Sequence, residues 1–138
     1  MADINARYRR DGWLPIRVLK GNYPHSELIS FFLMADLCIV SSLHDGMNLV
    51  AKEFVSARPD GNAALLLSRF TGAARELDCA IQINPYDTER VADAIREALE
   101  MPPEERRRRM EAMRVVVAEN NIYDWAANVV TDIRRLAT

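Results

Sequence analysis

The sequence predicts an α/β fold, a Rossmann-like, doubly wound parallel sheet of about four strands with flanking helices. Four short runs, at residues 15–20, 37–40, 63–68 and 80–83, are typical of strands. The runs at 37–40 and 63–68 are apolar almost throughout, as in strands that are covered on both faces. Helical patterns alternate with these runs, which favours parallel strands joined by right-handed crossovers. The chain has 138 residues, which is close to the usual size of one domain, about 100–200 residues.

Apolar residues three or four positions apart indicate the helices. The first is expected at 3–10, and the second follows Ser26, a candidate N-cap, to about residue 35. Further helices are expected at 47–57, at 71–76, between the turn at 84–88 and Pro102, from residue 104 onward, and after the Asn pair at 120–121. Trp13 and Trp125 are interpreted as packing residues.

Composition and charge argue against several classes of protein. The sequence is 49% hydrophobic and 28% charged, with a net charge of −2, so disorder and a basic nucleic-acid platform are both disfavoured. The arginine run at 106–109 follows two glutamates and is interpreted as a solvated helix face. No apolar run approaches the ~20 residues of a membrane span. The N-terminus carries no apolar signal core, so we expect no membrane association and a cytoplasmic location.

The two cysteines do not indicate a metal centre. Cys38 and Cys79 lie 41 positions apart, without a C-x-x-C motif, and only His25 and His44 could join them as soft ligands. We interpret both as buried strand cysteines. No metal and no cofactor is predicted.

In open α/β sheets, ligands bind outside the carboxyl ends of the strands, where loops lead into helices. This rule selects the segments 21–26, 41–48, 69–74 and 84–88. In the second of them, Gly46 lets a ligand approach the backbone without a Cβ in the way. The amides of residues 46–49, expected in the first helical turn, form a phosphate site there. Glu53 follows seven residues later, about 10 Å along the helix axis, which suits a ribose.

A simpler interpretation of the same segment stays open at this point. In it, Asp45 is the N-cap of a helix and Glu53 is a solvated helix residue.

Several motifs together resemble trehalose-6-phosphate synthases. They are residues 45–54 (DGMNLVAKEF), 56–59 (SARP), 67–77 (LSRFTGAAREL), 84–88 (NPYDT), the Asp124-Trp125 pair, and the preceding 4–8 (INARY) and Gly12-Trp13-x-Pro15. They occur in one unbroken order over nearly the whole chain. The resemblance implies a retaining glycosyltransferase of the GT-B fold, with two Rossmann-like halves. Such an enzyme transfers glucose from UDP-glucose, the donor, to glucose 6-phosphate, the acceptor.

The resemblance also implies roles for individual residues. Asp45 matches the residue that holds the glucose hydroxyls, and Glu53 matches the carboxylate that binds the ribose. The other matched positions are Gly46, Met47, Asn48 and Leu49 at the diphosphate and sugar, Leu49 and Val50 at the nucleoside, and Asn22 and Tyr23 at the nucleobase. The family usually has Pro and Arg where this chain has Ser42 and His44, so a fixed positive charge near the diphosphate is missing.

Residues 1–138 are therefore expected to form a single, partial domain that binds a nucleotide-sugar donor, from the C-terminal half of such an enzyme, with the N-terminal acceptor domain absent. We expect the chain alone to be inactive and to self-associate through an exposed sheet edge near residues 15–20. Two alternatives stay open. One is a related glycosyltransferase or pseudo-glycosyltransferase with another donor, and the other is a non-catalytic nucleotide-binding or interaction module.

Overall fold

Three parallel strands form the sheet in this computed structural model, which describes residues 1–136. They are β1 (Leu37–Val40), β2 (Ala64–Ser68) and β3 (Ile81–Ile83), in the spatial order β1-β2-β3. Leu37 lies opposite Ala64, and Leu66 lies opposite Ile81. Every residue of the central strand β2 is buried, as expected for an apolar strand with helices on both faces.

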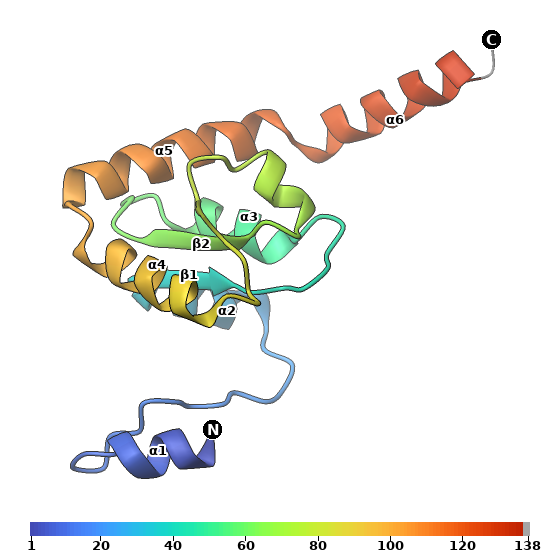
Figure 1. Cartoon of the computed structure of the whole chain (residues 1–138). Helices are drawn as coiled ribbons and strands as arrows, with labels where there is room; N and C mark the ends of the chain where they lie inside the picture. Colours follow the sequence, from blue (N-terminus) through green and yellow to red (C-terminus); the bar gives the residue numbers. More distant parts are fainter. Residues whose placement is uncertain (137–138) are drawn as a thin grey trace.

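Helices cover both faces of the sheet (Figure 1). Leu65 and Leu67 of β2 belong to a core cluster with α3 (Leu49–Ala57) and α5 (Pro103–Glu119). The alternate residues Ala64 and Leu66 join a second cluster with α4 (Thr88–Glu100). Because successive strand residues point to opposite faces, one short strand supports both halves of the core. The doubly wound α/β class predicted from the sequence is confirmed.

The remaining helices are α1 (Ala2–Tyr8), α2 (His25–Met34), the 3₁₀ helix η1 (Gly72–Arg75) and α6 (Ile122–Leu136). α2 packs on α3 through the rings of Phe32 and Phe54, whose centroids are 5.8 Å apart. Its N-cap is Pro24 and not Ser26. Met110 and Met113 of α5 are buried in the core.

The strand predicted at 15–20 does not form, so the sheet has three strands and not about four. The side chain of Asn5 forms hydrogen bonds with both backbone groups of Ile16. It accepts from the Ile16 amide at 2.9 Å and donates to the Ile16 carbonyl at 2.8 Å. Those groups are thereby satisfied without a neighbouring strand. The edge strands of the described sheet are consequently β1 and β3, and self-association through an open edge stays a prediction.

The tryptophans are not packing residues within the described chain. Trp13 is 57% exposed and Trp125 is 53% exposed. α6, which carries Trp125, has no buried residue and extends away from the sheet (Figure 1). Apolar spacing predicted the helix correctly but not its burial, because burial depends on a neighbour that the spacing does not identify.

The cysteines differ from each other. Cys38 lies in β1, and burial raises the pKa of its thiol to about 11. Cys79 is in the turn before β3 and not in a strand. None of the helices formed by residues 1–136 is long and apolar enough to cross a membrane.

Candidate functional site

The loops that follow the three strands meet at the carboxyl edge of the sheet. Asp45, after β1, forms an isolated parallel bridge with Thr71, after β2. The Arg69 amide donates to the carbonyl of Ile83 at 3.0 Å. Segments 41–48, 69–74 and 84–88, which the sequence selected, therefore lie together. Segment 21–26 follows no strand and leads into α2, where the ring of Tyr23 lies against that of Phe31.

The loop of residues 45–48 is organised by the carboxylate of Asp45. Its Oδ1 accepts from the Met47 amide at 3.1 Å, and its Oδ2 accepts from Nδ2 of Asn48 at 2.9 Å. These two hydrogen bonds, with a smaller contribution from the nearby His44, hold the pKa of Asp45 below its usual value. The carboxylate is thus ionised at neutral pH and serves as the internal brace of the loop.

α3 begins later than the sequence suggested. Asn48 is its N-cap, with a φ of 70°, and the Oδ1 of Asn48 accepts from the Ala51 amide at 2.9 Å. Only Leu49 of the four predicted amides lies in the helix, so the expectation that all four sit in its first turn is wrong. The interpretation of Asp45 as the N-cap is wrong too. Asparagine tolerates the left-handed region better than most residues, which explains why it occupies this position.

Gly46 is not required by the rest of the described chain. A Cβ at this position would meet nothing within 4 Å. Its φ is also outside the left-handed region that favours glycine. Its amide donates to no acceptor in residues 1–136. The loop therefore presents a bare backbone to the exterior.

Glu53 lies on the side of α3 that faces α2. It is half-buried and lines a cavity of about 290 Å³ together with His25, Ile29, Leu49 and Ser56. Its carboxylate has no hydrogen bond or ion pair to any residue that the structure describes. A half-buried carboxylate with free lone pairs is suited to accept from hydroxyl groups of a ligand.

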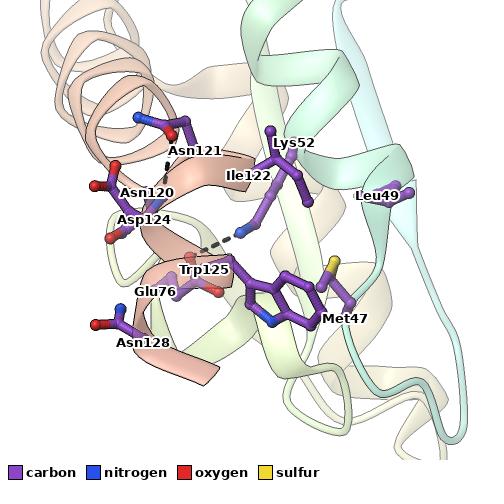
Figure 2. A pocket seen from close by; sticks show the side chains of 10 residues that line it. All are labelled: Met47, Leu49, Lys52, Glu76, Asn120, Asn121, Ile122, Asp124, Trp125 and Asn128. Carbon is purple, nitrogen blue, oxygen red and sulfur yellow. Dashed lines mark hydrogen bonds and ion pairs between the residues drawn. The ribbon is translucent and has the colours of Figure 1, made fainter. Parts of the chain in front are cut away.

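A second cavity, of about 340 Å³, lies on another side of α3 and is drawn in Figure 2. Met47, Leu49 and Trp125 line it, with polar residues from the α5–α6 junction. In the wall of this cavity, Nζ of Lys52 in α3 forms an ion pair with Oε2 of Glu76 at 2.8 Å (Figure 2). Sequence reasoning missed the pairing of Lys52 with Glu76, because their separation of 24 positions follows no secondary-structure period.

The predicted site residues are thus divided between two sides of α3. Met47 and Leu49 line the cavity in Figure 2, whereas Leu49 and Glu53 line the other. Val50 is 47% exposed, and Asn22, exposed, and Tyr23, half-buried, line neither of these two cavities.

The charges near the loop are sparse. Arg69 and Arg75 are exposed, and Lys52 is paired with Glu76. In the arginine run of α5, Arg108 and Arg109 pair with Glu105. Within residues 1–136, no three His, Cys, Asp or Glu side chains gather as a metal site would require.

Comparison with known proteins gives one consistent result. The family model of glycosyltransferase family 20 matches residues 1–135. The trehalose-6-phosphate synthase of Klebsiella pneumoniae is 43% identical over 135 residues, which are 97% of this chain but 28% of that protein.

Solved structures agree with this. A trehalose-phosphate synthase from Burkholderia xenovorans, in complex with glucose-6-phosphate, superposes with a TM-score of 0.90 at 43% identity, covering 96% of this chain and 30% of that one. The E. coli protein solved with UDP-2-fluoro glucose has a TM-score of 0.89 at 39% identity, covering 95% of this chain and 29% of that one. The chain therefore spans less than a third of the relatives that it matches.

Proposed function

Because this chain belongs to glycosyltransferase family 20, we propose that it is the nucleotide-sugar-binding part of a trehalose-6-phosphate synthase. The complete enzyme would transfer glucose from UDP-glucose to glucose 6-phosphate. The observation that carries this proposal is Gly46. Neither space nor backbone conformation within the chain requires a glycine there, and glycine lowers stability through its flexibility. Close approach of a ligand to the backbone accounts for it.

The loop would act on the leaving group of the transfer. As the bond between glucose and the diphosphate breaks, negative charge increases on the diphosphate oxygen. Backbone amides that are already oriented stabilise such a charge without reorganisation. The Gly46 amide is free to donate, and the start of α3 adds the positive end of a helix dipole.

The two carboxylates would bind hydroxyl groups. Asp45 already accepts from Met47 and Asn48, but a carboxylate has about four acceptor positions, so two remain for the glucose hydroxyls. Glu53 would accept from the ribose hydroxyls of the nucleotide. Leu49, which lines both cavities beside α3, would contact the nucleoside between these points, together with Val50, and Asn22 and Tyr23 would border the nucleobase.

Titration of UDP into the chain and its Glu53→Ala variant by calorimetry tests this assignment. Loss of charge-assisted hydrogen bonds, worth about 1.5–3 kcal/mol, should weaken UDP binding by roughly ten- to hundredfold. Glu97→Ala is the matched control, since Glu97 is an exposed glutamate of α4, on the opposite face of the sheet. Equal affinities of the Glu53→Ala variant and the unchanged chain would leave Glu53 as a solvated helix residue.

The same titration with GDP separates the proposed donor from another nucleotide sugar. Tighter binding of GDP than of UDP would favour a related transferase with a different donor. No binding of either nucleotide, to a chain shown to be folded, would contradict the proposed function altogether.

A further inference from the structure

Backbone hydrogen bonds join the 45–48 loop to residues 70–73, the segment that follows β2. The Asp45 amide donates to the carbonyl of Phe70 at 3.3 Å, and the Gly72 amide donates to the carbonyl of Asp45 at 3.0 Å. A third backbone hydrogen bond, 2.8 Å long, joins the Ala73 amide to the carbonyl of Met47. Two loops that follow different strands are therefore joined as a short extension of the parallel sheet.

The two backbones approach so closely at Gly72 that no side chain fits between them. A Cβ on Gly72 would stand 2.1 Å from the carbonyl oxygen of Gly46, 2.9 Å from its carbonyl carbon, and 3.3 Å from Cα of Met47. All three obstacles are backbone atoms and cannot rotate away. The φ of Gly72 lies outside the left-handed region, so the glycine is needed here for space and not for conformation.

The supporting segment, residues 70–74, is anchored in the core and cannot move away from the loop. Thr71 is buried, and its hydroxyl donates to the carbonyl of Ser68 at 2.9 Å, at the end of β2. Ala73 and Ala74 are buried in the core beneath the loop. The 45–48 loop, by contrast, has exposed residues at Gly46 and Met47. A group inserted at position 72 would therefore displace the loop and not the support, because the interior is close-packed.

We infer that Gly72 is a positioning residue for the diphosphate site: it sets where the Gly46 and Met47 amides lie, without contacting the ligand. The inference rests on the proposed function, since it takes the 45–48 loop as the place where the nucleotide binds. The affinity for the nucleotide then depends also on a residue of the segment that joins β2 to β3. Small displacements of oriented groups have large effects on such sites.

Gly72→Ala, compared with Ala98→Gly, tests the inference. Ala98 is buried in α4 on the other face of the sheet, so its truncation lowers stability without reaching the loop. Gly72→Ala should weaken UDP binding at least tenfold and shift the amide resonances of residues 45–48. Ala98→Gly should change UDP affinity less than twofold. Unchanged affinity and unchanged resonances in a folded Gly72→Ala chain would overturn the inference.

Two further readouts keep the outcomes distinct. If the unchanged chain binds no UDP, the proposed function fails, and the amide shifts in the free Gly72→Ala chain still decide whether Gly72 sets the loop position. If Gly72→Ala does not fold, hydrogen exchange in the unchanged chain decides. Slow exchange of the Gly72 and Ala73 amides supports the inference, and rapid exchange of both overturns it.

Discussion

Arg58 joins the end of one helix to the turn that follows another. Its side chain is buried and donates to three carbonyls at the C-terminal end of α2 and to that of Asn62. Its guanidinium also pairs with both carboxylate oxygens of Asp60, at 2.8 and 2.9 Å, which lowers the pKa of that carboxyl. The last carbonyls of a helix lack intrahelical donors, so one side chain satisfies groups that would otherwise be left without partners.

Replacement of Arg58 should therefore be costly. We expect Arg58→Ala to lower the free energy of unfolding by about 3 kcal/mol or more, because several buried acceptors lose their donor together. Denaturation by urea measures this. Arg96→Ala is the control, since Arg96 pairs with no described residue except Asp93, in an exposed ion pair, and such pairs contribute about 0–1 kcal/mol. Similar losses in the two variants would contradict the assigned role of Arg58.

At the scale of elements, Glu105 in the first turn of α5 is held by two arginines of the following turn. Glu105 accepts from Arg108 and Arg109 at 2.7 Å. These hydrogen bonds hold the pKa of Glu105 at about 2, below its usual value of 4.5. A carboxylate at the N-terminal end of a helix also complements the helix dipole.

This arrangement predicts a pH-dependent contribution to stability. The depressed pKa means that Glu105 stabilises the fold above about pH 4.5 and loses that contribution as the pH falls toward about 2. The melting temperature of Glu105→Gln should thus be below that of the unchanged chain at pH 7, and the difference should disappear near pH 2. Glu104→Gln removes a charge from the same turn and serves as control. A difference that persists at pH 2 would show that the ion pairs are not its cause.

The elements that could be predicted from the sequence are those whose formation depends on residues within the element or next to it along the chain. β1 and β2 are apolar runs that must be buried, and α4 has both its apolar spacing and its N-cap, Asp87, in the sequence. The segment at 15–20 has a similar pattern, but the side chain of Asn5 satisfies Ile16 instead of a neighbouring strand. No pattern within 15–20 contains that information.

The features of the candidate site likewise divide into those that the local sequence reveals and those that only the folded structure reveals. Asp45 and Gly46 could be found from the sequence, because a loop between a buried strand and a helix is a local feature. The contact between Gly72 and Gly46, and the ion pair between Lys52 and Glu76, join segments that only the folded sheet brings together. The start of α3 was misplaced because Asn48 adopts a positive φ, which the helical spacing of the following residues does not reveal.

At the scale of the whole molecule, the chain covers 28% of a curated relative and about 30% of the solved ones. We expect the 138-residue chain alone to form no trehalose 6-phosphate from UDP-glucose and glucose 6-phosphate. The activity of those relatives belongs to the whole proteins, and the site proposed for this chain would bind only the donor. Chromatographic detection of the product measures this. Product formation by the purified chain would show that residues 1–138 also bind the acceptor.

The central claim is that the bare backbone at Gly46 is where the nucleotide diphosphate binds. Gly46→Ala tests it most directly, because a Cβ there meets nothing in the described chain. The substitution should leave stability unchanged or raise it by about 0.4–1 kcal/mol, through a less flexible unfolded state. Calorimetric titration of UDP into both chains should show at least a tenfold loss of affinity in the Gly46→Ala variant, whose melting temperature is not lowered. Equal affinity of the two chains for UDP would contradict the claim.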